Sequence, residues 1–214
     1  MRKILCISMI LVFSLIASFS FAKGLELSFF LGMKDGSENS DGVIVTFAIE
    51  EGGKATSAIE QLWSKQQWSD KFTADLTKWA GKTVTLKLTT DPGKARNTGW
   101  DWILIGDAKI TNDDKLVFDI GQAVADNKFK PAIVVDGDNK ETDKLGFGAT
   151  CAPDAGPSGK QAKPKSFMQH PPWDGKVGNT ISRYDVALPS VAGGVTAVDK
   201  AGKATTTWGA LKAY

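Results

Sequence analysis

Tryptophan and histidine are the two residue types that most restrict the chemistry open to this chain. The 214 residues include seven Trp and one His. A single imidazole excludes a His-rich zinc site and leaves only His170 for catalysis that depends on histidine. Indole rings offer flat apolar faces, and carboxylate, amide and guanidinium groups offer hydrogen bonds. Loops that combine these groups suit a ligand with both kinds of surface.

The acidic and nucleophilic residues form no pattern typical of an enzyme. No two of the Glu residues beyond position 22 lie two or four positions apart on one predicted strand face, as paired catalytic carboxylates could. These residues are Glu26, Glu38, Glu50, Glu51, Glu60 and Glu141. A Cys151–His170 nucleophile pair is an alternative, whereas the Gly-x-Ser-x-Gly elbow of serine hydrolases is absent. We therefore expect a protein that binds and does not catalyse.

The first 22 residues predict a secretory signal peptide. Arg2 and Lys3 precede an apolar stretch, and Ser20-Phe21-Ala22 has small residues where cleavage after Ala22 requires them. A membrane anchor is the less favoured alternative, because the apolar stretch is shorter than the roughly 20 residues that span a bilayer. We expect a secreted protein, periplasmic or extracellular, with no membrane contact after cleavage.

The charge balance argues against a nucleic-acid partner. The chain has 26 Lys and Arg against 24 Asp and Glu, and the two surplus positive charges, Arg2 and Lys3, belong to the predicted signal peptide. The remaining chain is formally neutral, so no strong field points to nucleic acid or to an anionic membrane. Cys151 would be its only cysteine, which excludes an intrachain disulfide and leaves the core to hold the fold.

Residues 25–110 predict an all-β fold, an antiparallel β-sandwich. Short runs rich in β-branched and aromatic residues are separated by turns of Gly, Asp, Asn and Pro. In 43–49 and 83–89, apolar and polar residues alternate with period 2, which is typical of a sheet with one solvated face. The predicted strands are Leu25–Met33, Val43–Glu50, Ala58–Ser64, Lys71–Leu76, Thr83–Thr89 and Trp100–Ile105.

Residues 111–190 are less regular. Lys115–Ile120 and Ala132–Val135 are predicted strands, with a short helix around Gln122–Asn127 between them. A loop from Cys151 to Lys165 follows, and Thr180–Leu188 again alternates as a strand. Residues 191–214 predict a C-terminal hairpin or tail, for which we infer no function.

Several strings of residues resemble parts of one protein family. Strings of residues between Trp68 and Trp102, which include Asn97-Thr98-Gly99-Trp100-Asp101-Trp102, resemble the second half of galactose-binding-like β-sandwich modules. His170-Pro171-Pro172-Trp173 and residues 184–189 resemble the first half, and residues 25–38 resemble the segment that comes after that half. Such modules are jelly rolls associated with secreted bacterial glycoside hydrolases. The resemblance implies that the chain binds a polysaccharide or glycan and positions a glycoside hydrolase or a cell-surface partner on it.

The two halves of the family pattern occur here in reversed order. Residues 23–110 resemble its second half and residues 111–190 its first half. One explanation is a single, circularly permuted sandwich over 23–190, and the other is two truncated neighbouring modules. We favour the first, because neither half alone supplies enough strands to close a core and domain termini commonly lie close together. It predicts that Thr180–Leu188 lies beside Leu25–Met33.

Alternating strand directions bring several polar loops to one end of the predicted sandwich. Up-and-down strands place the loops 35–42, 63–70 and 91–99 there, and the family order adds 170–179. The candidate ligand-binding residues on these loops are Trp63, Trp68, Arg96, Asn97, Trp100, His170, Trp173 and Asp174. The alternative for each Trp is burial, which we expect for Trp102, on one strand face with Leu104, and for Trp79 at the opposite end.

This mixture of residues suits a sugar. The C–H face of a pyranose stacks on an exposed aromatic ring, while polar side chains bind its hydroxyls. We therefore hypothesise a secreted, non-catalytic carbohydrate-binding module. The alternatives are a structural or adhesive protein-interaction module, favoured by a flat apolar sheet face, and, less favoured, a small β-sandwich glycoside hydrolase. Asp35 and Asp41 are candidate ligands for a structural calcium ion, and no other cofactor is expected.

Overall fold

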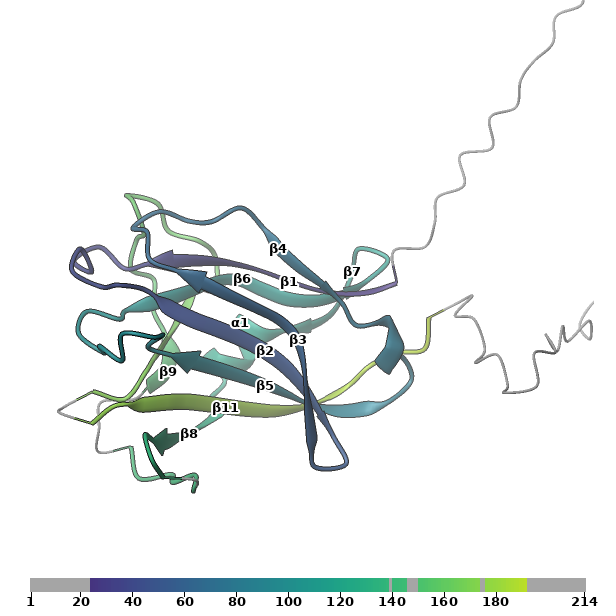
Figure 1. Ribbon diagram of the computed structural model, residues 1–214. Helices are drawn as coiled ribbons and strands as arrows, with labels where there is room; N and C mark the ends of the chain where they lie inside the picture. The colour runs from purple at the N-terminus through teal and green to yellow at the C-terminus, as the bar shows by residue number, and fades with distance from the viewer. Residues whose placement is uncertain (1–23, 139, 146–149, 174–175, 192–214) are drawn as a thin grey trace, which may run out of the picture.

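Two antiparallel sheets pack face to face, which confirms the predicted all-β sandwich (Figure 1). The computed structural model describes residues 24–138, 140–145, 150–173 and 176–191. The predicted signal peptide, Asp174 and nearly all of the predicted C-terminal hairpin lie outside these residues. None of the helices in the described ranges is long and apolar enough to cross a membrane.

Sheet A is built from six of the strands. They are β1 (Leu25–Met33), β4 (Phe72–Asp75), β6 (Ile103–Asn112), β7 (Lys115–Asp119), β9 (Thr150–Pro153) and β10 (Phe167–His170). Their order is β4-β1-β6-β10-β9, and β7 also pairs with β6. The sequence did not predict β9 and β10. Both strands have only four residues, too few to establish an alternating pattern.

Sheet B is built from the other five strands. They are β2 (Val43–Glu51), β3 (Lys54–Trp63), β5 (Thr83–Asp91), β8 (Lys130–Val135) and β11 (Gly178–Ala187), in the order β3-β2-β5-β11-β8. The short 3₁₀ helix η1 spans Thr77–Trp79, and α1 spans Ile120–Ala125. The side chain of Asp119 caps α1 by accepting a hydrogen bond of 2.9 Å from the backbone N–H of Gln122.

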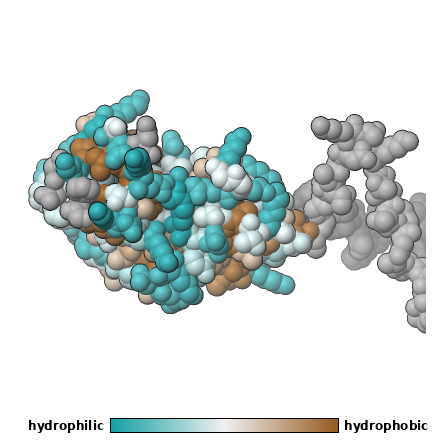
Figure 2. All heavy atoms as spheres, turned by 90° about the horizontal axis from the view of Figure 1, so that it is seen from below, coloured by the Kyte–Doolittle hydropathy of each residue, from teal (hydrophilic) through white to brown (hydrophobic). Residues whose placement is uncertain are grey.

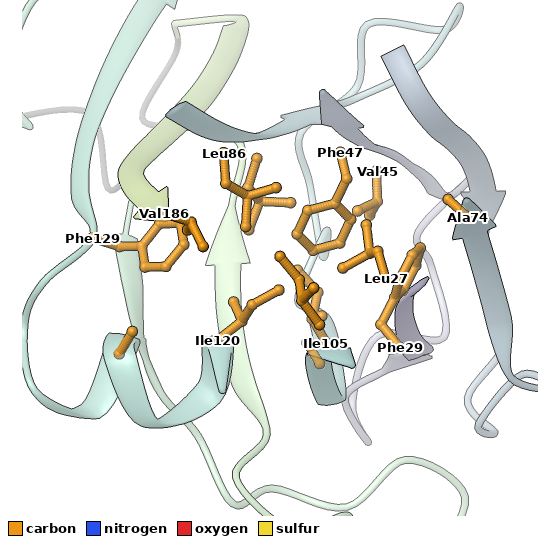
Figure 3. Packing of buried hydrophobic residues seen from close by; sticks show 14 of the residues in the cluster. Leu27, Phe29, Val45, Phe47, Ala74, Leu86, Ile105, Ile120, Phe129 and Val186 are labelled. Atoms are coloured by element: carbon orange, nitrogen blue, oxygen red, sulfur yellow. The ribbon is translucent and has the colours of Figure 1, made fainter. Parts of the chain in front are cut away.

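The inward-facing residues of the two sheets form one hydrophobic core. Figure 3 shows Phe47 and Leu86 of sheet B facing Ile105 of sheet A, and the rings of Phe29 and Phe47 meet across the sheets with centroids 4.8 Å apart. Trp79 on η1 is 5% exposed and closes one end of this core, as predicted. Burial of such apolar surface is the main force that holds a fold without disulfides.

The strand pairing expected from the permuted order is wrong. β11 is hydrogen-bonded to β5 and β8 in sheet B, whereas β1 is hydrogen-bonded to β4 and β6 in sheet A. Both edges of β1 are therefore already occupied, and Thr180–Leu188 does not lie beside Leu25–Met33. Strands from 23–110 and from 111–190 are nevertheless combined in both sheets and share the core.

The loops and the chain ends lie at opposite ends of the sandwich. The connections after β1, β3, β5, β8 and β10 gather at the left in Figure 1, whereas both ends of the described chain leave at the right. We call the end of the sandwich where these five connections lie the loop end. A segment attached at residue 24 or 191 would therefore begin on the side away from the loop end.

Candidate functional site

Two tryptophans are strongly exposed at the loop end. The side chains of Trp100 and Trp173 are 46% and 53% exposed. Trp100 lies three residues before β6, and Trp173 lies three residues after β10. Because β6 and β10 are antiparallel neighbours, with Phe167 opposite Ile105, the two tryptophans leave the sheet at adjacent points. The exposed aromatic surface predicted from the sequence is thus provided by these two residues.

Each exposed indole rests on another ring. Trp100 meets Trp102 edge to face, with centroids 5.4 Å apart and planes at 60°. Trp173 is tilted over His170, with centroids 6.0 Å apart. A ring that packs against a second ring is already restricted in its rotamers, so it loses little side-chain conformational entropy when a ligand binds to its outer face.

The predicted burial of Trp102 is wrong, because the strand begins later than expected. β6 starts at Ile103, and Trp100 has a left-handed backbone with φ of 67°. The strand-like alternation assumed from Trp100 therefore does not occur. Trp102 is half-buried, and Asp101 is the residue that turns inward.

Asp101 is a fully buried carboxyl at the loop end, and the sequence analysis did not single it out. Its exposed fraction is 0%, and its Oδ1 accepts a hydrogen bond of 2.6 Å from the hydroxyl of Ser40. Its Oδ2 has no hydrogen-bond partner within the described chain. Burial, with a smaller contribution from the nearby charge of Asp41, raises the pKa of Asp101 to about 7 against the opposing effect of the Ser40 hydrogen bond. The carboxyl therefore changes charge near neutral pH.

Arg96 and Asn97 stabilise the loop that carries Trp100. The Arg96 guanidinium forms ion pairs with Asp91, at 2.8 Å, and with Asp136. The hydrogen bond to Asp136 is the main cause that raises the pKa of Arg96. Asn97 accepts a hydrogen bond of 2.9 Å from the backbone N–H of Gly99. Arg96 is thus occupied by two carboxylates, whereas the side chain of Asn97 is exposed.

The indole N–H groups of Trp63 and Trp68 donate hydrogen bonds, whereas those of Trp100 and Trp173 have no such partner among the described residues. The indole N–H of Trp63 donates to the carbonyls of Lys65, at 2.9 Å, and Gln67, at 3.1 Å. The indole N–H of Trp68 donates to the carbonyl of Gln161 at 2.8 Å.

The ring of Trp68 lies on sheet A where two strands carry glycine. A Cβ added to Gly32 would come within 3.0 Å of the ring, and one added to Gly106 within 2.9 Å. These two positions leave room for the indole on the outer face of the sheet. Trp68 therefore holds the 158–163 segment to sheet A and belongs to the scaffold.

His170 is buried and supports the site from below. It is 4% exposed, its Nδ1 contacts the carbonyl of Pro171 at 2.5 Å, and burial lowers its pKa. Contact between His170 and a ligand, as predicted from the sequence, would require the loop to open. Its role in the structure is to carry the ring of Trp173.

Cys151 and His170 do not form an activated pair. In the β9–β10 register Cys151 lies opposite Gln169, and His170 lies opposite Thr150. Burial raises the pKa of the Cys151 thiol to about 12, so the thiol stays protonated at neutral pH. A cysteine nucleophile therefore has no support from this geometry.

Polar residues replace the hydrophobic core beneath the loop end. Gln169 of β10 is fully buried, and its Nε2 donates to the carbonyl of Leu88 at 3.2 Å and to that of Thr180 at 3.1 Å. Because Leu88 and Thr180 belong to sheet B, this amide ties the two sheets together. The hydroxyl of Thr180 also donates to the carbonyl of His170. These bonds hold β10, and with it the base of Trp173, against sheet B.

Asp35 and Asp41, the predicted calcium ligands, both lie on the loop after β1. Asp35 accepts a hydrogen bond of 2.9 Å from the backbone N–H of Gly159, and Asp41 is exposed. Across the described ranges, no three His, Cys, Asp or Glu side chains gather as metal ligands would. The calcium ion therefore stays a prediction.

Comparison of the chain with models of protein families, with curated proteins and with solved structures found no match. The resemblance to galactose-binding-like modules therefore stays a prediction.

Proposed function

We propose that this protein binds a glycan at its loop end, with Trp100 and Trp173 as stacking platforms. The observation that carries the proposal is the pair of half-exposed indoles, each supported by a second ring and placed at the ends of adjacent strands. Exposed aromatic faces of this kind stack on the C–H surface of a sugar ring. The two supporting rings belong to Trp102 and His170, so four aromatic residues gather at the loop end.

Polar side chains around the platforms match the hydroxyl groups of a sugar. Glu38, Asn39 and Asp41 are exposed on the loop after β1, and Asn97 is exposed on the loop before β6. Carboxylates accept hydrogen bonds from hydroxyls, and amides both donate and accept them. The site therefore combines the two kinds of group that a glycan needs.

The protein-interaction alternative has less support. Among the described residues, the exposed large hydrophobic side chains besides the two tryptophans are Leu62 on β3 and Leu116 on β7, in different sheets. The face seen in Figure 2 is mostly hydrophilic, with hydrophobic residues in separate small patches. A flat apolar sheet face, which would favour a protein partner, is not evident on the face seen there.

A glycan array tests the proposal. Residues 23–214 should bind one or more neutral polysaccharides and ignore most unrelated glycans. In a ¹⁵N-labelled sample, the indole N–H signals of Trp100 and Trp173 should shift when a binding polysaccharide is added. Those of Trp63 and Trp68, which donate to backbone carbonyls, should stay in place. The proposal is wrong if the array shows no glycan bound.

A further inference from the structure

The outer face of sheet B contains a trough that the loop-end site does not use. It has a volume of about 500 Å³. Ile44, Thr46 and Ala48 of β2 line it together with Thr89 of β5. A hollow of this size is in the range of small-ligand sites.

The strand register explains why the face is hollow. One row of outward residues runs Glu60, Thr46, Thr89 across β3, β2 and β5, and the next row runs Ser57, Ala48, Lys87. The short side chains of Thr46, Ala48, Ser57 and Thr89 lie between the longer Glu60 at one corner and Lys87 at the opposite corner, so the surface between these two is hollow. Ala48 is only 6% exposed, although its position on β2 faces away from the core.

The charges around the trough balance. Lys87 lies 3.3 Å from the carboxylate of Glu50, and Asp91 pairs with Arg96. Glu60 on β3, which accepts a hydrogen bond of 3.3 Å from the hydroxyl of Thr46, and Lys94 on the loop after β5 carry opposite charges. A neutral occupant therefore fits this surface better than a polyanion or a polycation.

The remaining polar groups of the trough suit hydroxyls. Thr46, Ser57 and Thr89 supply hydroxyl groups. Asn179 of β11 supplies an amide at the edge of the trough. An occupant with many hydroxyl groups can donate to the carboxylate of Glu60 and exchange hydrogen bonds with the hydroxyls of Ser57 and Thr89.

The trough is continuous with the loop end. Asp91 ends β5, and Gly93 and Lys94 begin the loop that carries Trp100 and leads into β6. We infer that the trough holds further residues of an extended, neutral polysaccharide whose chain crosses this loop and reaches Trp100. This inference rests on the proposed function. The preferred ligand is then an internal segment of a long chain, and not an isolated sugar or a chain end.

Isothermal titration of residues 23–214 with disaccharides and hexasaccharides of cellulose, xylan and mannan tests the inference. The wild type should bind a hexasaccharide at least about tenfold more tightly than the matching disaccharide. Ser57 is exposed on β3, and Ser57→Arg extends a bulky side chain across the trough. This variant should lose the tighter binding of the hexasaccharide and bind the disaccharide as the wild type does. Ala187→Arg makes the same charge change at an exposed position on the same face of sheet B, outside the trough, and should change neither affinity.

The outcomes separate the trough from the loop end. Equal affinity for hexasaccharide and disaccharide, or no effect of Ser57→Arg, would overturn the trough inference and leave the loop-end proposal standing. Failure of the wild type to bind any saccharide would refute the proposed function itself. Sedimentation of the wild type as a dimer that Ser57→Arg disrupts would assign the trough to a second copy of the chain and would also overturn the inference.

Discussion

The indole of Trp100 meets the indole of Trp102 edge to face, with ring centroids 5.4 Å apart, and the residue between them is buried. This arrangement results from the left-handed backbone of Trp100, which ends the alternation expected of a strand. The same turn that exposes Trp100 therefore places the carboxyl of Asp101 inside the protein. Exposure of the ring and burial of the carboxyl are two results of one local conformation.

Asp101 should make the stability of the protein depend on pH. Its pKa is about 7 in the folded chain against an ordinary value of 3.8, so the folded state holds this proton more tightly than the unfolded state. The stabilisation is fully present below pH 4 and is lost as the pH rises to 7. Asp101→Asn should therefore match the wild type near pH 4 and exceed its free energy of unfolding by up to about 4 kcal/mol at pH 8. Urea unfolding from pH 4 to 8 measures this, and parallel curves for the two proteins would contradict the account.

Arg96 should stabilise the loop end through its two ion pairs. Arg96→Ala leaves Asp91 and Asp136 without their cation, and we expect a loss of about 1 kcal/mol, because the groups are partly exposed. High salt should weaken the wild type and narrow this difference. Lys94→Ala, in the same loop, is the matched control and should have little effect. Equal losses in the two variants at low salt would show that the ion pairs contribute nothing.

Trp68 should contribute to stability and not to glycan binding. Trp68→Ala removes a ring packed over Gly32 and Gly106, together with its hydrogen bond to Gln161. Thermal or urea unfolding should show a loss of about 2–3 kcal/mol, less than for a fully buried Trp. Trp68→Phe keeps most of the packing and should lose less. A folded Trp68→Ala protein that no longer binds glycans would place Trp68 in the site and contradict its assignment to the scaffold.

Cys151 should be unreactive in the folded protein. Its thiol pKa of about 12, against 9.0 ordinarily, lowers the thiolate fraction at pH 8 roughly a thousandfold. Alkylation by iodoacetamide at pH 8 should be slow without denaturant and fast in urea, where Cys151 is exposed. Rapid labelling of the native protein would revive the nucleophile alternative.

Much of the fold could be predicted from residue patterns. The alternation in Val43–Ile49 and Thr83–Thr89 identified β2 and β5, because each strand has one face against the core and one in water. Leu25–Met33 was predicted with the bounds of β1. β10 was not predicted, because its two inward positions are Phe167 and the polar Gln169. The burial of Gln169 depends on hydrogen bonds to carbonyls of the other sheet. No local pattern reveals such a partner.

The candidate site could be predicted only in part. Strand directions that follow from short connections placed Trp100 at one end, and the order of the segments in the resembled family added Trp173. The sequence could not separate these residues from Trp63 and Trp68, whose indole groups are bound by carbonyls of the loops after β3 and β9. The trough was missed for a related reason. Thr46, Ala48 and Thr89 form a hollow only once the register aligns them with the longer Glu60 and Lys87.

Affinity electrophoresis of three proteins tests the central claim most directly. The wild type, Trp173→Ala and Leu116→Ala are run in gels that contain cellulose derivatives, xylan, mannan or galactan. Leu116 is an equally exposed hydrophobic residue on β7 in sheet A, so its replacement controls for general loss of apolar surface. We predict that at least one polysaccharide retards the wild type and Leu116→Ala equally and retards Trp173→Ala much less. Equal retardation of all three proteins on every polysaccharide would contradict a glycan site built on Trp173.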